Sequence, residues 1–257
     1  MALFADGLVT ADVSGAGPTV WVLHSLLADA GSCLPLAAAL SPRFRVVVPD
    51  LPGFGGSAGA AGLEAVAARV AAAIAEDAAV HGSVTVIGNG YGSFVALLVA
   101  LRRPGVVGRL VLAGTGAAFS EPGRAAFRGM AAAAEGKGLA AIADVAMRRL
   151  FAPDFQAANS GLTAVRRARF LATEPGVFGR ACADLAAVDL RGEVPALRLP
   201  VLVVVGEGDE ATPPAMAREL AGLVPGALFQ ELPGVAHVPQ LQDTAGFVAV
   251  VEGFLAG

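Results

Sequence analysis

The stretch Val84–Leu98, VTVIGNGYGSFVALL, contains the pattern that decides the fold. It begins with a β-branched run typical of a buried strand and ends in an apolar run long enough to start a helix. Between them, Gly88, Gly90 and Gly92 form a glycine-rich turn, which allows a strand and a helix to approach closely. The stretch therefore predicts a strand, a tight turn and a helix, the repeating unit of an α/β fold.

The same alternation extends along the chain in both directions. Short β-branched runs are separated by longer alanine-rich helical stretches, which favours parallel strands joined by crossover helices. Most of these runs are continuously apolar, as expected where both faces of a parallel sheet are covered. The predicted strands are 19–23, 45–48, 84–87, 109–113, 200–205 and 227–232, with a further pair of short strands within 3–14.

One interval, 115–198, contains helical patterns and no convincing strand, and it is too long for a simple crossover. We interpret it as a helical cap inserted over the carboxyl edge of the sheet, where open α/β sheets bind ligands. The whole chain, 1–257, is then a single domain that carries this insertion. The cap is mildly basic, and seven arginines are candidates to meet an anionic substrate, although solvated helix faces explain most of them: Arg124, Arg128, Arg148, Arg149, Arg166, Arg167 and Arg169.

Composition excludes several classes of protein. With 257 residues and 55 % hydrophobic content, the chain can bury a full core. A net charge of -4 and the absence of any long basic run argue against a nucleic-acid surface. The start carries no secretory signal pattern and the longest apolar runs are far too short for a membrane span, so we expect a cytoplasmic protein. Cys33 and Cys182 lie far apart without metal-ligand spacing, which favours reduced, buried thiols.

Five segments, taken together and in order, resemble the α/β-hydrolase fold family, in particular its esterase and lactonase branch with the 3-oxoadipate enol-lactonases. The segments are VLHSL at 22–26, PDLPGFGGS at 49–57, GNGYG at 88–92, VGEGDEATP at 205–213 and GVAHVPQ at 234–240. Two positions depart from the family pattern. Gly90 replaces the nucleophilic serine of the Gly-x-Ser-x-Gly elbow, and Ser25 replaces the usual glycine of the His-Gly pair.

The resemblance implies a role for each matching residue. His237 is expected to act as general base and then general acid, and Asp209 to hold its tautomer. The backbone amides of Tyr91 and of Ser25 or Leu26 are expected to form the oxyanion hole. His24, Asn89 and Thr115 are expected around the substrate pocket.

Gly90 leaves three functions open. In the first, an esterase or lactonase is impaired by a natural or engineered substitution. In the second, His237 and Asp209 activate water or abstract a substrate proton directly, as in cofactor-free lyases or oxygenases of this fold. In the third, the chain is a catalytically silent protein that binds a small molecule. The sequence implies neither a metal nor an organic cofactor, and no pattern in it specifies an oligomeric state.

Overall fold

The computed structural model describes residues 1–256 and contains an eight-stranded sheet in the order β1-β2-β4-β3-β5-β6-β7-β8. Strands β1 (Ala2–Phe4) and β2 (Val9–Ser14) are antiparallel to their neighbours, and the other six strands are parallel. These six are β3 (Thr19–Leu23), β4 (Arg45–Pro49), β5 (Val84–Asn89), β6 (Val107–Ala113), β7 (Val201–Gly206) and β8 (Leu228–Leu232). The predicted mostly parallel sheet is confirmed, with strand bounds that differ by two residues or fewer.

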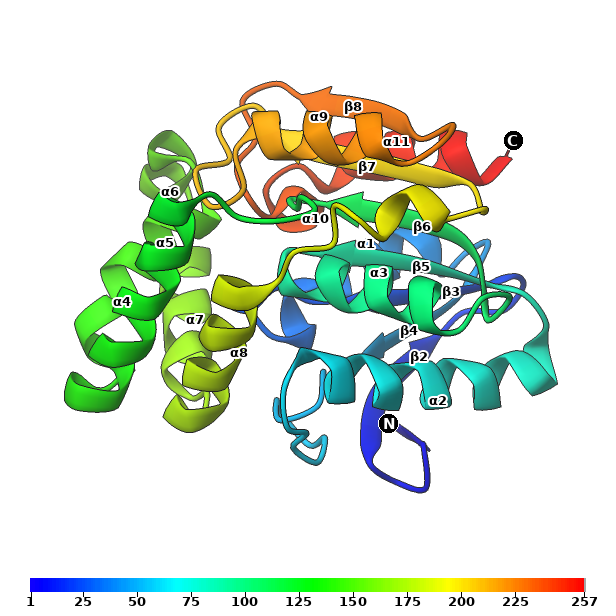
Figure 1. Cartoon of the computed structure of the whole chain (residues 1–257), viewed down its shortest axis with the longest axis horizontal. Helices are drawn as coiled ribbons and strands as arrows, with labels where there is room; N and C mark the ends of the chain where they lie inside the picture. The colour runs from blue at the N-terminus through cyan, green and yellow to red at the C-terminus, as the bar shows by residue number, and fades with distance from the viewer. Residues whose placement is uncertain (257) are drawn as a thin grey trace.

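Helices cover both faces of the sheet (Figure 1). Side chains of one strand alternate between the faces, so that Val20 and Val22 of β3 join one apolar cluster while Trp21 and Leu23 join the other. One face packs against α1 (Leu34–Leu40) and α11 (Thr244–Ala256); the other packs against α2 (Leu63–His81), α3 (Tyr91–Arg102) and α9 (Pro214–Leu223). Most of the parallel strands are covered on both faces and largely apolar, whereas the edge strand β8, LFQEL, is partly exposed and contains Gln230 and Glu231.

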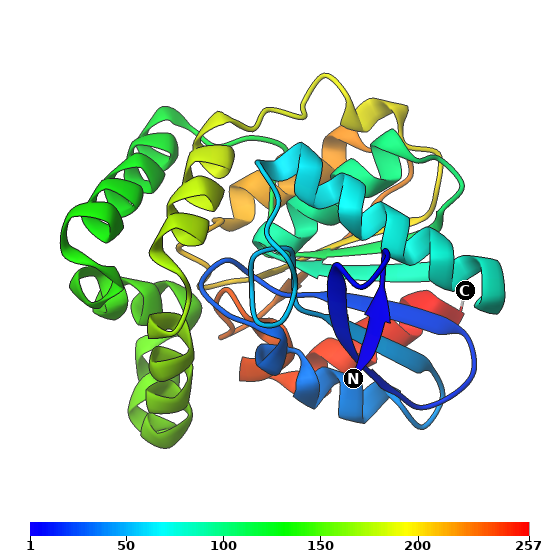
Figure 2. The same ribbon diagram turned by 90° about the horizontal axis from the view of Figure 1, so that it is seen from below.

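Between β6 and β7 the chain forms helices and leaves the sheet. We call this part, residues 115–198, the cap segment. It contains α4 (Glu121–Lys137), α5 (Ala143–Leu150), α6 (Pro153–Ala158), α7 (Ser160–Leu171) and α8 (Pro175–Ala187), with 3-10 turns at Leu139–Ile142 and Val194–Ala196. These helices gather on one side of the molecule (Figures 1 and 2). That the cap segment works as an insertion on a single domain stays a prediction.

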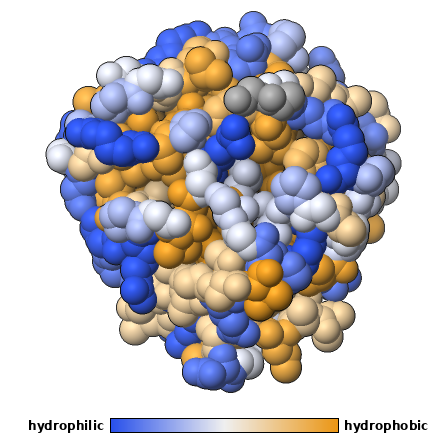
Figure 3. Space-filling model, turned by 90° about the vertical axis from the view of Figure 1, so that its right-hand side faces the viewer, coloured by the Kyte–Doolittle hydropathy of each residue, from blue (hydrophilic) through white to orange (hydrophobic). Residues whose placement is uncertain are grey.

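The face of the molecule remote from the cap segment intermixes hydrophilic and hydrophobic residues (Figure 3). Among residues 1–256, no helix combines the length and the apolar character needed to cross a lipid bilayer.

Both cysteines are free and buried, and burial raises the pKa of the Cys33 and Cys182 thiols to about 12. Two further short elements, the 3-10 turn Ala30–Ser32 and α10 (Pro239–Gln242), flank loops of the site described next.

Candidate active site

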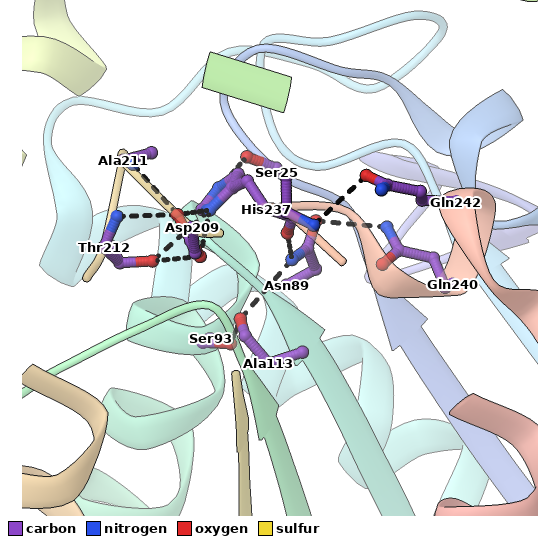
Figure 4. Close-up of polar contacts among 11 residues, drawn as sticks. Ser25, Asn89, Ser93, Ala113, Asp209, Ala211, Thr212, His237, Gln240 and Gln242 are labelled. Carbon is purple, nitrogen blue, oxygen red and sulfur yellow. Dashed lines mark hydrogen bonds and ion pairs between the residues drawn. The ribbon is translucent and has the colours of Figure 1, made fainter. Parts of the chain in front are cut away.

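Four loops at the carboxyl edge of the sheet bring the predicted site residues together. Ser25 follows β3, Gly90 follows β5, Asp209 follows β7 and His237 follows β8. Because all four strands are parallel, their carboxyl ends lie at the same edge. Residues separated by up to 212 positions in sequence thus become neighbours, and His237 lies between Asp209 and Ser25 (Figure 4).

His237 and Asp209 form a buried pair. The Nδ1 atom of His237 lies 2.9 Å from Oδ2 of Asp209, and both side chains are almost fully excluded from solvent. A carboxylate only accepts hydrogen bonds, so Nδ1 carries the proton and Nε2 keeps a free lone pair. The arrangement leaves Nε2 as a proton acceptor on the side of the ring that faces away from the acid.

Thr212 fixes the orientation of this carboxylate, a contact that sequence analysis missed. Its hydroxyl donates to Oδ2 of Asp209 at 2.8 Å, and the backbone N–H groups of Ala211 and Thr212 donate to Oδ1 at 2.9 Å each. An aspartate that accepts from the backbone two or three residues later is a common loop motif. The sequence DEAT contains the residues for it, so the signal was present at 209–212.

Asn89 holds the histidine loop against the elbow. Its Nδ2 donates to the carbonyl of His237 at 2.8 Å, and its Oδ1 accepts from Nε2 of Gln240 at 3.1 Å. Gln242 supports the same loop, accepting from the N–H of Ala236 and donating to the carbonyl of Gly234. Asn89 is not among the residues that line the cavity described below, and its amide binds the backbone of His237 and the side chain of Gln240. Its place at the substrate pocket stays a prediction.

The elbow requires two of its glycines by close packing. A Cβ on Gly92 would lie 2.5 Å from the carbonyl oxygen of Leu23, and a Cβ on Gly88 would lie 2.6 Å from the carbonyl oxygen of Gly92. Neither distance is compatible with a side chain. The spacing of the motif is therefore preserved because β5 and α3 pack backbone against backbone.

Gly90 stands at the tip of the elbow with φ +54° and ψ -117°. A Cβ at this position would lie 2.5 Å from Oγ of Ser25 and 2.7 Å from Nε2 of His237. The volume that an elbow serine needs is therefore already filled by the hydroxyl of Ser25. That hydroxyl lies 3.1 Å from Nε2 of His237, within hydrogen-bonding distance.

His24 fixes the backbone of the neighbouring Ser25. The N–H of Leu51 donates to Nε2 of His24 at 3.1 Å, so the proton of the neutral ring is on Nδ1, which donates to the carbonyl of Ser25 at 3.0 Å. Burial lowers the pKa of His24, which favours this neutral form. His24 is fully buried and does not line the cavity. Both of its ring nitrogens bind backbone groups, and its place at the substrate pocket stays a prediction.

A cavity of about 20 Å³ adjoins Gly90 and His237. This is room for about one water molecule, so admission of a substrate requires side chains of the cap segment to shift. Its lining consists of Ser25, Leu26, Leu27, Gly90, Tyr91, Phe94, Phe119, Phe127, Met130, Arg149, Leu185, Ala211, Thr212 and His237. Thr115 is absent from this lining; it is fully buried and its hydroxyl donates to the carbonyl of Gly116. Its place at the substrate pocket stays a prediction.

Of the seven cap arginines that are candidates to meet a substrate, Arg149 lines this cavity. Most of the others bind groups of the protein itself. Arg124 donates to the carbonyls at the end of α8; Arg128 pairs with Glu121, Arg166 and Arg169 with Asp29, and Arg167 with Asp144. The expectation that most of these side chains are unrelated to a substrate agrees with these contacts, and Arg149 remains as the candidate.

Two other residues near the elbow have clear structural positions. The hydroxyl of Ser93 donates to the carbonyl of Ala113 at 3.0 Å, beneath the elbow. Tyr91 lines the cavity, and its hydroxyl lies 3.4 Å from Asp184. Burial raises the pKa of the Tyr91 phenol, so this group stays protonated.

Comparison with known proteins places this geometry in context. The model of the alpha/beta hydrolase fold family matches residues 18–244. A pimeloyl-[acyl-carrier protein] methyl ester esterase of Methylococcus capsulatus is 29 % identical over 254 residues, which cover 95 % of this chain and 97 % of the esterase. The polyketide synthase ThaQ of Burkholderia thailandensis is 30 % identical over 248 residues, and the chain spans 12 % of its length.

Among solved structures, an enol-lactonase from Burkholderia xenovorans LB400 superimposes with a TM-score of 0.90 at 27 % identity, covering 97 % of this chain and 96 % of the lactonase. The predicted resemblance to esterases and enol-lactonases is thereby confirmed. Because the family model matches residues 18–244, which are most of this chain, the chain belongs to the alpha/beta hydrolase fold family.

Proposed function

We propose that this protein hydrolyses a small carboxylic ester or lactone, with His237 as the general base and acid. The observation that carries the proposal is the position of His237, which lines the cavity beside Gly90 while Asp209 holds its Nδ1. An imidazole of fixed tautomer with one free lone pair is the group that removes a proton from an attacking hydroxyl. The likeness to a methyl ester esterase and to an enol-lactonase supports the same reaction class.

The developing oxyanion has two candidate donors. Tyr91 is the first residue of α3, so its N–H has no acceptor within the helix. The helix terminus also carries partial positive charge, which favours a negative oxygen nearby. Leu26, in the loop after β3, also lines the cavity, and we assign its N–H as the second donor. The predicted oxyanion hole thus consists of Tyr91 and Leu26, and Ser25 contributes its side chain to the site.

The lining of the cavity favours an apolar acyl group with an acidic function at its far end. Phe94, Phe119 and Phe127 pack against one another, with ring centroids 5.4 and 4.8 Å apart along the series. Arg149 is the one guanidinium among the lining residues, all of which belong to the described part of the chain. A carboxylate or other anion on the substrate pairs with it.

Two free, buried thiols suit a reducing compartment, so the cytoplasm is the expected location.

The experiment is hydrolysis of p-nitrophenyl butyrate by the wild type and by His237→Ala, with folding verified by circular dichroism. We expect the variant to lose turnover by a factor on the order of 10⁴ to 10⁶. Asp209→Asn is expected to lose about 10⁴-fold, because the amide no longer selects the tautomer. A folded His237→Ala protein with the wild-type rate would overturn the proposal. Product analysis separates hydrolysis from elimination or oxygenation, since hydrolysis alone gives equal amounts of acid and alcohol.

Arg149→Met tests the substrate class. Methionine keeps much of the apolar stem and removes the charge. We expect kcat/KM for a half-ester of a dicarboxylic acid to fall about tenfold or more, as expected for the loss of one charge-assisted hydrogen bond, and the value for the neutral butyrate ester to change little. Equal effects on both esters would contradict a role in binding an anion.

A further inference from the structure

We infer that Ser25 is the nucleophile of this enzyme, supplied by the loop after β3 in place of the missing elbow serine. The inference rests on the proposed hydrolytic function and names the residue that completes its site. Two departures from the family pattern carry it together: serine is found at 25 where the family has glycine, and glycine is found at 90 where the family has serine. The structure makes these two positions direct neighbours.

The geometry at the two positions is complementary. The Oγ atom of Ser25 lies 2.5 Å from where a Cβ of residue 90 would be, so the relocated hydroxyl fills the volume that the elbow serine would fill. The same atom lies 3.1 Å from Nε2 of His237, whose Nδ1 lies 2.9 Å from Asp209. A hydroxyl, an imidazole and a carboxylate are therefore connected in one hydrogen-bonded series, which is the arrangement that activates a serine.

The backbone of Ser25 is held in place from below. Nδ1 of His24 donates to the carbonyl of Ser25, and Nε2 accepts from the N–H of Leu51. The His24 side chain is fully buried. A nucleophile needs a fixed position within about 0.5 Å of the productive geometry. His24 is thus a positioning residue for Ser25, which explains why a fully buried histidine precedes it.

Each step of the reaction is balanced with the groups present. The proton of the Ser25 hydroxyl passes to Nε2 of His237 as Oγ forms a bond to the ester carbonyl carbon, and the carbonyl electron pair moves to oxygen. The carbon–alkoxide bond then breaks, and the leaving oxygen takes the proton from Nε2. Water next gives a proton to Nε2 and attacks the acyl carbon; the bond to Oγ breaks, and Ser25 recovers its proton. The sum is ester plus water giving acid plus alcohol.

The oxyanion donors suit this nucleophile. When the serine is at 25, the N–H of the residue that follows it belongs to Leu26, and the N–H of Tyr91 comes from the start of α3 across the cavity. In the family arrangement the same two loops supply these donors with their order exchanged. The N–H groups of Leu26 and Tyr91 can therefore serve as the oxyanion donors when the nucleophilic hydroxyl is on residue 25 in place of residue 90.

The first test is covalent labelling, which needs no ester turnover. The wild type is treated with a fluorophosphonate, which transfers its phosphonyl group to an activated serine with loss of fluoride. The label is located by tandem mass spectrometry. We expect it on Ser25, within the tryptic peptide 1–43, and we expect no label in His237→Ala. A label on any other residue, or none on wild-type protein, would overturn the inference.

The second test compares kcat for Ser25→Ala and Ser93→Ala. Ser93 is a matched control: it is also a buried serine next to the elbow, but its hydroxyl donates to the carbonyl of Ala113 and does not line the cavity. We expect a loss on the order of 10⁴-fold or more for Ser25→Ala and less than about twofold for Ser93→Ala. Comparable kcat values for Ser25→Ala and wild type would contradict the inference, with circular dichroism as the check on folding.

The third test is the exchange variant Ser25→Gly/Gly90→Ser, which returns the family pattern. Removal of the Ser25 side chain clears the atom 2.5 Å from the new Cβ. We expect the exchange variant to recover at least about a hundredfold over Ser25→Gly and to accept the phosphonate on residue 90. No recovery in a folded exchange variant would argue against equivalence of the two positions.

The outcomes separate the inference from the proposed function. Loss of ester turnover in His237→Ala, with full activity in Ser25→Ala and no label on Ser25 of the wild type, would keep the hydrolase and reject Ser25 as nucleophile. A label on Ser25 in a protein that turns over no ester would reject the ester substrate and keep the activated serine.

Discussion

Gly90→Ala is the change that probes the packing between the elbow and Ser25 most simply. The new methyl group would lie 2.5 Å from Oγ of Ser25 and 2.7 Å from Nε2 of His237, against ordinary Cβ contacts of 3.4–4 Å. An alanine held at φ +54° costs about 1–3 kcal/mol in backbone strain. Overpacking against two buried side chains adds about 1–3 kcal/mol. We therefore expect the free energy of unfolding to fall by about 2–6 kcal/mol.

The control for backbone strain is Gly82→Ala. Gly82 also has a positive φ, +83°, and a Cβ there would meet no atom within 4 Å. This variant should lose about 1–3 kcal/mol and keep full ester turnover.

The assay is urea unfolding together with turnover of p-nitrophenyl butyrate for both variants. Gly90→Ala should be the less stable of the two and should lose about a hundredfold or more in kcat, because the methyl group separates Ser25 from His237. Equal stability losses with wild-type turnover in Gly90→Ala would refute the placement of the Ser25 hydroxyl beside residue 90.

Three further predictions follow from buried polar groups. Thr212→Val should lower the free energy of unfolding by about 1.5–3 kcal/mol and also lower kcat, because the buried carboxylate of Asp209 loses a donor; an unchanged kcat and denaturation midpoint would contradict this. Burial lowers the pKa of His24 below its ordinary 6.5, so below pH 6.5 the unfolded chain binds a proton that the folded chain does not. The free energy of unfolding should then fall by up to about 1.4 kcal/mol for each pH unit below 6.5, and His24→Gln should have a shallower slope; parallel pH profiles would contradict this. With pKa values near 12, Cys33 and Cys182 should resist iodoacetamide at pH 8 until the protein is unfolded; rapid alkylation of the native protein would contradict their burial.

The sequence was sufficient to predict the sheet and the acid–base pair. Parallel strands buried on both faces need apolar runs, so their number and place were visible in the pattern of the sequence. His237 and Asp209 were predicted from motifs that keep fixed places at the ends of strands. The family model and the structural neighbours bear out the fold, while the catalytic roles stay predictions that the experiments above test.

The sequence was least informative where function depends on which side chains touch across loops. Ser25 and Gly90 were each noted as departures from the family. Only the three-dimensional structure shows that the Ser25 hydroxyl fills the volume left by the missing side chain at residue 90. His24, Asn89 and Thr115 were assigned to the pocket because they are close to the motifs in sequence. In the structure each of the three makes a hydrogen bond to backbone, a contact that a one-dimensional pattern does not reveal.

The most direct measurement is the site of acyl transfer from a slowly released reagent. Incubation of the wild type with a p-nitrophenyl dialkylcarbamate should leave a stable carbamoyl group, together with one equivalent of released nitrophenol, and peptide sequencing by mass spectrometry should place that group on Ser25. A carbamoyl group on a different residue, or continuous release of nitrophenol without a modified protein, would contradict the account of a serine moved from the elbow to the loop after β3.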